Sequence, residues 1–166
     1  MKLIRHCLDE CWDILADVSD PEIPVLSVLD LGMIRGVDLN ENDELIVRLT
    51  PTYSGCPATD LLTTEITQAL EAKGFSPVKV VVDLSEAWTT DWMSAAGKVK
   101  LQQYGIAPPQ GEAHNCGTHV ALVDGIACPH CHSTDTKLLS EFSSTACKAL
   151  YQCRDCLEPF DYFKCI

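Results

Sequence analysis

Basic side chains are scarce in this sequence. Its 166 residues include 12 lysines and arginines against 24 aspartates and glutamates, which gives a net charge of −12. Residues 1–105 carry 17 acidic and 8 basic groups, and residues 106–166 carry 7 and 4, so both parts are acidic. Nucleic-acid binding rests mainly on basic groups that neutralise phosphates. The charge therefore argues against nucleic acid as a partner and favours protein partners.

Long apolar runs are also lacking. No stretch approaches the roughly 20 apolar residues that a membrane-spanning helix needs. The start of the chain, MKLIRHCLDECWDIL, is too charged for the apolar part of a signal peptide. We therefore expect a cytoplasmic protein with no membrane partner. In such a reducing compartment, the ten cysteines indicate metal binding or catalysis instead of disulfides.

The apolar pattern of residues 1–105 predicts a small two-layer α+β domain, a sheet covered by helices. The predicted elements are a helix over 6–18, a strand over 28–37, a hairpin turn over 40–43, a strand over 44–50, a helix over 57–73, a strand over 78–84 and a helix that ends near 105. The unbroken apolar run Val80-Val81-Val82 predicts that the last strand is central in the sheet.

A linker and a second, smaller domain follow. Four prolines and glycines mark residues 106–125 as a linker: Pro108, Pro109, Gly111 and Gly117. The second domain then covers residues 126–166. Its apolar and aromatic residues predict three short strands, over 136–142, 146–152 and 158–164.

Two cysteine pairs in the second domain predict a metal site. Cys128 and Cys131 form one C-x2-C pair, Cys153 and Cys156 form another, and 21 residues separate the pairs. Two such pairs at this separation are typical of a zinc ribbon. A domain of about 40 residues buries too little apolar surface to fold alone. A bound zinc ion supplies the missing free energy, about 10 kcal/mol or more.

This metal site is expected to be structural. Four thiolates fill all four positions of a zinc ion, so none remains open for a substrate. We expect one zinc ion per chain. The alternative metal is iron, bound singly or as a cluster, because four cysteines also suit iron–sulfur chemistry.

A single cysteine, Cys56, stands at a predicted strand-to-helix junction in the segment TPTYSGCPATD. Proline is favoured at the first position of a helix, so Pro57 predicts that Cys56 is the N-cap residue. The helix N-terminus would then favour the thiolate form of its side chain. Asp20 and Glu22 are either a plain acidic turn or charged groups that the fold brings beside Cys56. The alternative for Cys56 is a buried small apolar side chain.

The remaining thiols and imidazoles are expected to be structural or solvated. Cys7 and Cys11 lie on the apolar stripe of the first predicted helix, which favours core packing over metal binding. Cys147 and Cys165 are expected to pack with the strands, although either could be a spare metal ligand. His130 and His132 are expected to be solvated. A further motif with ligand spacing, of unassigned role, lies in the linker at His114, Cys116 and His119.

Several segments resemble known families. DPEIPVLSVLDLGMIRGV and TPTYSGCPATD resemble the signature segments of the small domain shared by SufT-like and cytosolic iron–sulfur assembly proteins. WTTDWMSAAGKVKLQQYGIAPP, followed by CPHC, SEFSSTACKALYQCRDC and EPFDYFK, resembles the PaaD (or PaaJ) family. These are accessory subunits of the bacterial phenylacetyl-CoA ring-epoxidase system. The resemblance covers nearly the whole chain except the linker segment HNCGTHV.

The resemblance implies a non-catalytic role. The epoxidase uses oxygen, NADPH, a di-iron subunit and a flavin and iron–sulfur reductase, and PaaD-type proteins are not thought to carry out its chemistry. This protein would instead assist the assembly or insertion of the reductase's iron–sulfur centre. Cys56 matches the family's reactive cysteine, with transient contact to iron or a cluster. Asp20 and Glu22 match its acidic DPE motif, and the four ribbon cysteines match its metal ligands.

Other functions stay open at this point. A thiol-dependent enzyme with Cys56 as nucleophile needs an adjacent base, and the only histidine of residues 1–105 is His6. A structural subunit that bridges epoxidase components has the same sequence features as an assembly factor. A nucleic-acid-binding ribbon is disfavoured by the acidic charge.

Overall fold

The computed structural model describes residues 2–110 and 125–166, with side chains from residue 8 onward. The chain divides into two compact units, Met1–Trp88 and Thr89–Ile166. Among the described residues, no helix combines the length and the apolar character needed to cross a membrane.

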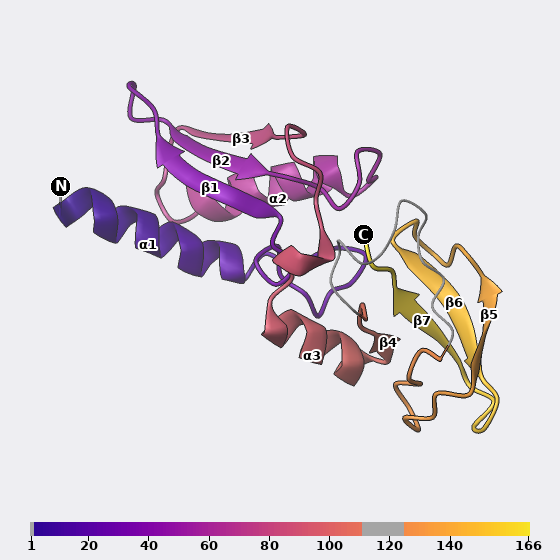
Figure 1. Ribbon diagram of the computed structural model, residues 1–166. Helices are drawn as coiled ribbons and strands as arrows, with labels where there is room; N and C mark the ends of the chain where they lie inside the picture. The colour runs from indigo at the N-terminus through magenta and orange to yellow at the C-terminus, as the bar shows by residue number, and fades with distance from the viewer. Residues whose placement is uncertain (1, 111–124) are drawn as a thin grey trace. The chain divides into compact units, whose positions relative to one another are not determined.

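The first unit is a three-stranded sheet with two helices (Figure 1). Its elements are α1 (Lys2–Ala16), β1 (Ile34–Leu39), β2 (Leu45–Leu49), α2 (Thr59–Glu71) and β3 (Val78–Val82). The strand order is β1-β2-β3, in which β1 and β2 pair antiparallel and β2 and β3 pair parallel. A parallel pair needs a crossover connection, and α2 supplies it.

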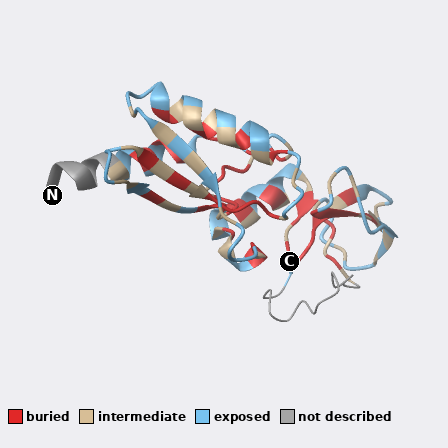
Figure 2. Ribbon diagram, turned by 90° about the horizontal axis from the view of Figure 1, so that it is seen from above, coloured by how far each residue is buried: buried red, intermediate tan, exposed pale blue. Residues whose placement is uncertain are grey.

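The core of this unit lies between the sheet and the helices. Along β2, buried residues alternate with half-buried ones, so one face of the strand is fully covered. Helix α2 buries Leu62, Ile66 and Leu70, one residue per turn of its inner stripe. Cys11 and Leu15 of α1 are also fully buried. Figure 2 shows buried and exposed residues distributed along these helices and strands. The mixed α+β two-layer fold expected from the sequence is confirmed.

The strand expected over 28–37 begins later than predicted. Residues 28–32 form turns, and β1 starts at Ile34. The Asp30 carboxylate accepts hydrogen bonds from the backbone N–H and the hydroxyl of Ser27, at 3.1 and 3.2 Å. Gly32 then adopts a φ of 66°, which other residues rarely tolerate. These local hydrogen bonds hold this apolar segment in a turn. The alternation of its apolar residues predicts a strand and gives no sign of the turn.

The central position predicted for the strand at 78–84 is wrong. Strand β2 is central, and β3 pairs with no other strand among the described residues. Val81 and Val82 are 36% and 42% exposed. The apolar run Val80-Val81-Val82 therefore reflects the β propensity of valine, and does not require burial on both faces.

The second unit is a four-stranded sheet preceded by short helices. Its elements are a 3-10 helix, η1 (Thr90–Trp92), α3 (Ala95–Tyr104), β4 (Ile106–Ala107), β5 (Thr136–Ser140), β6 (Lys148–Cys153) and β7 (Pro159–Phe163). The strand order is β4-β7-β6-β5. The three predicted ribbon strands are confirmed, with ends that differ by at most two residues from those predicted. Strand β4, which the sequence pattern does not predict, pairs parallel with β7.

Aromatic rings beside the ribbon cysteines form the core of the second unit. The Tyr151 ring stacks on Phe160 at 6.0 Å between centroids and meets Tyr162 edge-on at 5.7 Å. The same cluster contains Cys128 and Cys153, both fully buried. Aromatic pairs of this kind supply much of the apolar burial in so small a sheet.

The boundary between the two units comes earlier in the chain than the predicted boundary at residue 105. Helix α3 starts at the Ser94 cap, whose hydroxyl accepts from the Gly97 N–H at 2.8 Å, and ends at Gly105 with a φ of 91°. This helix and β4 belong to the second unit. The linker expected over 106–125 is wrong at its start, where Ile106 and Ala107 form β4. Residues 111–124 lie outside the described residues, so that part of the linker stays a prediction.

Candidate metal centre and cysteine site

Cys56 lies in the connection from β2 to α2, at the carboxyl end of the central strand. Its backbone N–H donates to the Tyr53 carbonyl at 3.1 Å. Its carbonyl accepts from the Thr59 N–H at 3.2 Å and from the Thr59 hydroxyl at 2.9 Å. These bonds close two consecutive turns around the cysteine. The position of Cys56 is therefore set by local backbone bonding on both sides.

The expected N-cap role of Cys56 is not observed. The N-cap residue of α2 is Ala58, which makes no side-chain capping bond, and the helix begins at Thr59. Pro57 lies in the turn before the helix instead of at its first position. The bonds from Thr59 to the Cys56 carbonyl add this extra turn. Thr59 is not singled out by the sequence pattern. Its only signal is its place three residues after the cysteine.

The environment of Cys56 favours the neutral thiol. Burial raises the pKa of the Cys56 thiol above its ordinary value, and the charges of Glu22 and Asp20 raise it further. The Ala58 backbone N–H and the Thr59 side chain lower this pKa, but they do not reverse the shift. The expected net lowering of this pKa is therefore wrong, because burial and the two carboxylates outweigh the backbone N–H of Ala58, the N-cap residue of α2. Both acidic side chains act electrostatically on the cysteine, a question that the sequence left open.

Asp20 also organises the loop that carries Glu22. Its Oδ1 atom accepts hydrogen bonds from the backbone N–H groups of Glu22 and Ile23, both at 2.8 Å. Its own N–H donates to the Leu26 carbonyl at 2.8 Å. With 6% exposure, Asp20 is buried, and such a bonded carboxylate fixes an aspartate turn. Asp20 thus holds the loop in shape and places a second charge near the thiol.

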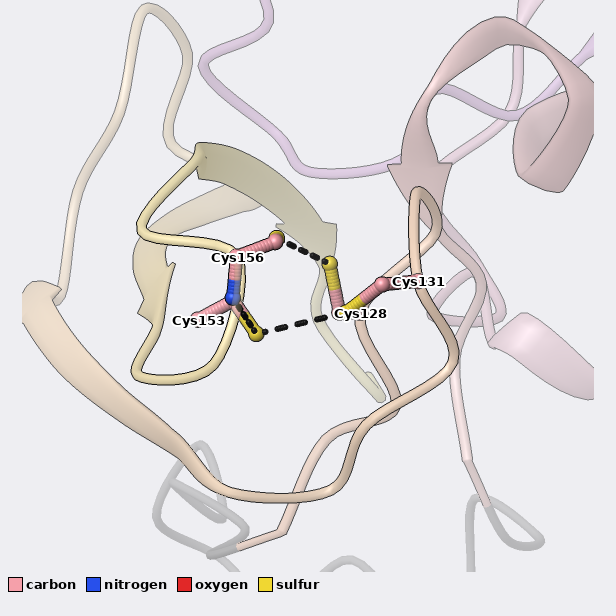
Figure 3. Close-up of side chains that lie close together, drawn as sticks. All are labelled: Cys128, Cys131, Cys153 and Cys156. Atoms are coloured by element: carbon pink, nitrogen blue, oxygen red, sulfur yellow. Dashed lines mark hydrogen bonds between the residues drawn. The ribbon is translucent and has the colours of Figure 1, made fainter.

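The four ribbon cysteines converge on one point (Figure 3). The Sγ atoms of Cys128, Cys131, Cys153 and Cys156 all lie within 4.8 Å of one another. Two Sγ–Sγ distances are 3.7 Å, between Cys128 and Cys156, and 3.5 Å, between Cys131 and Cys153. Four sulfurs at about 2.3 Å from a tetrahedral zinc ion lie about 3.8 Å apart. The site therefore fits a single ion.

Backbone bonds shape the two cysteine turns. The His132 N–H donates to the Cys128 carbonyl at 2.9 Å, and the Arg154 N–H donates to the Asp135 carbonyl at 2.8 Å. His132 and Leu157, each directly after the second cysteine of a pair, have positive φ angles of 64° and 67°. Each pair is thus followed directly by a residue in the left-handed region of backbone conformation.

The charge balance of this site calls for a cation. The Cys156 N–H, 3.5 Å from the Cys153 Sγ, lowers the pKa of Cys153 to about 7. The Glu158 N–H lowers the pKa of Cys156, but burial and the neighbouring sulfurs raise it to about 12. Sulfurs this close do not all ionise by themselves, because like charges repel. A bound divalent metal ion reverses this balance and deprotonates its thiols.

The other cysteines and histidines mostly follow the sequence expectations. Cys11 is buried in the core of the first unit, and Cys147 and Cys165 are buried in the second. Cys165 is disulfide-bonded, so the expectation of no disulfides is wrong at this cysteine. None of these three belongs to the four-sulfur group. His130 and His132 are exposed, as expected. The side chain of Cys7 and the motif at 114–119 lie outside the described residues.

Two family models match this chain, one for each unit. Residues 8–82 match a family described as iron-sulfur cluster assembly protein. Residues 113–164 match a family described as PaaD zinc beta ribbon domain. The second match contains all four cysteines of the metal centre, and the first contains Asp20, Glu22 and Cys56.

Two curated relatives cover different lengths. A protein of Escherichia coli (strain K12), named as a subunit of a "Putative 1,2-phenylacetyl-CoA epoxidase", is 52% identical over 157 residues, which are 95% of this chain and 92% of the relative. A protein of Porphyromonas gingivalis (strain ATCC BAA-308 / W83), named "Fe-S protein maturation auxiliary factor", is 36% identical over 88 residues. That match covers 52% of this chain and 83% of the relative.

A solved structure resembles part of this fold. The crystal structure of the domain of unknown function DUF59 from Bacillus anthracis matches with a TM-score of 0.54 and 23% identity. It covers 58% of this chain and 92% of that chain. This likeness concerns the fold alone.

We predict that the purified protein is colourless and contains about one zinc ion per chain. Cys131→Ser should abolish zinc binding, because three thiolates leave the tetrahedral site incomplete. Cys147→Ser is the matched control: it removes a thiol from the same unit, outside the four-sulfur group, and should keep the zinc. Elemental analysis after gel filtration measures the zinc content of both variants. A coloured iron protein, or equal zinc in the two variants, would contradict this assignment.

We also predict slow alkylation of Cys56 at neutral pH. Its raised pKa means that less thiolate is present than in an ordinary cysteine, so labelling should accelerate only at alkaline pH. Glu22→Gln removes a charge that raises this pKa, and should speed labelling at a given pH. Glu41→Gln, in the exposed turn at the other end of β2, should not. Iodoacetamide labelling followed by peptide mass spectrometry reads these rates, and rapid labelling at neutral pH would disprove the shift.

Proposed function

Because the chain belongs to the PaaD family of phenylacetyl-CoA epoxidase accessory proteins, we propose that it is a non-catalytic accessory factor of such an epoxidase. In this proposal it helps to assemble or insert the iron–sulfur cluster of the reductase component. The support is the 52% identity over 95% of the chain, together with an assembly-type unit and a ribbon in the same chain. The reductase and the other epoxidase subunits would be its partners.

The pairing of a neutral thiol with two carboxylates carries this proposal. A cysteine nucleophile needs a thiolate, and the charges of Glu22 and Asp20 oppose its formation. The same charges attract a cation. A metal ion that approaches Cys56 displaces the thiol proton, and the carboxylates then face a positive charge. The site thus disfavours nucleophilic attack and favours contact with a metal ion.

Iron would be cargo at this site and not a resident cofactor. Stable iron–sulfur clusters are held by four cysteine thiolates, or by two cysteines and two histidines in some centres. Cys56 is the only cysteine of residues 12–88, and that segment contains no histidine. One thiolate with nearby carboxylates therefore suits transient contact, from which iron or a cluster can leave for a client. Zinc in the ribbon would stabilise the second unit and take no part in transfer.

An enzyme that uses Cys56 has little support. Nucleophilic catalysis by cysteine needs an adjacent base, most often histidine. The only histidine of the first unit is His6, and the groups that act on Cys56 are carboxylates, a backbone N–H and a hydroxyl. A structural subunit that bridges epoxidase components is the remaining alternative. This role does not require the Cys56 thiol.

Co-expression with the epoxidase reductase tests the proposal. Cys56→Ala should leave the fold and the zinc content intact, but should lower the iron and sulfide content of the reductase to the level found without this protein. Ser54→Ala, an exposed change in the same turn, should have no effect. If the reductase needs this protein for its cluster, but reaches the same iron and sulfide content with the Cys56→Ala variant, the role of the thiol is rejected. That result would favour the bridging subunit.

A further inference from the structure

A groove between α1 and α2 forms a second candidate site in the first unit. The two helices contact one another (labelled in Figure 1). The groove has a volume of about 430 Å³, within the range of cavities that hold ligands. Four apolar side chains contribute to its lining: Ile14, Val18, Ala69 and Ala72. Small alanines on α2 leave open the space that larger side chains would fill.

The rim of this groove is strongly acidic. Glu10, Asp13 and Asp17 line it from α1 and the residue that follows α1, and Lys73 is the one basic residue of its lining. Three carboxylates against one ammonium group give the groove a net negative charge. A ligand that buries apolar surface here must also carry positive charge.

The backbone adds to this negative potential. The groove lies along the C-terminal halves of both helices, where the unpaired carbonyl groups give a helix its negative end. Neither α1 nor α2 has a basic residue in its last turn. Asp13 and Asp17 at the end of α1 therefore oppose the helix dipole and cost stability. Such local conflicts with folding are expected at functional sites.

The groove is well separated from Cys56. Helix α2 has 13 residues and is therefore about 20 Å long. Cys56 precedes its first turn, whereas Ala69 and Ala72 belong to its last turn and its C-cap. A partner bound in the groove would leave the thiol accessible.

We propose that this groove binds a basic amphipathic segment of a partner protein, in which arginine or lysine residues flank apolar side chains. Charge complementarity selects this occupant. A second copy of this chain is a poor fit, because each copy has a net charge of −12. The inference goes beyond the proposed function, since binding in the groove requires neither Cys56 nor the epoxidase.

The test uses a fluorescein-labelled peptide with arginines on either side of a leucine face, and the full-length zinc-loaded protein. Fluorescence anisotropy at low salt measures the dissociation constant. The double variant Asp13→Asn/Asp17→Asn should bind about tenfold more weakly. Ala72→Arg, which places a tethered cation in the groove, should also weaken binding. Both changes lie at exposed helical or near-helical positions, so thermal unfolding should show an intact fold.

A matched control separates the groove from general attraction to an acidic protein. The double variant Glu41→Gln/Asp43→Asn removes the same charge from the hairpin turn between β1 and β2, outside the lining of the groove, and should bind like the wild type. Equal weakening in both double variants, or none in either, would overturn the proposal. So would equally tight binding of a peptide with serine in place of leucine, or of spermidine, because the apolar floor would then contribute nothing.

Discussion

The parallel pairing of β2 with β3 is the constraint on which the first unit depends. Two consecutive parallel strands cannot be joined by a tight turn, so the chain must cross over, and α2 is that crossover. The connection from β2 to α2 begins at the carboxyl end of the central strand, where open sheets of parallel strands commonly bind ligands. Cys56 lies in this connection. Because β2 is hydrogen-bonded on both sides, the start of the turn is held by a rigid element.

The charges around Cys56 then determine which form of its thiol is favoured. Burial, Glu22 and Asp20 all oppose a lone negative charge on sulfur, but only burial also opposes a bound cation. In the proposed function, the carboxylates therefore favour a metal-binding thiol over a nucleophile. The same electrostatic rule applies to the four cysteines of the ribbon. Four mutually repelling sulfurs become a stable site once a divalent ion is bound.

The ribbon is the part of this protein that sequence predicts best, because its ligands are read from covalent spacing. Two C-x2-C pairs and three short strands were sufficient to place Cys128, Cys131, Cys153 and Cys156 together. Strand β4 is not predicted from the sequence, because a strand of two residues is too short to show the alternation of apolar and polar residues. The sequence does not distinguish a central from an edge position for β3, because its run of valines is compatible with both.

Cys56 shows where sequence reasoning fails. Pro57 usually marks the first residue of a helix, but the bonds from Thr59 to the Cys56 carbonyl insert another turn. Cys56 therefore precedes the N-cap residue Ala58 instead of occupying that position. The effect of Glu22 on the thiol arises from a loop more than 30 residues away, which no local pattern reports.

In the proposed function, Cys56, with Glu22 and Asp20, makes contact with iron. An anaerobic iron(II) titration of the zinc-loaded protein, followed by thiolate-to-iron absorbance, measures this contact. We expect about one further iron per chain in the wild type, weaker binding in Glu22→Gln, and none in Cys56→Ala. Equal iron uptake by the wild type and Cys56→Ala would contradict it.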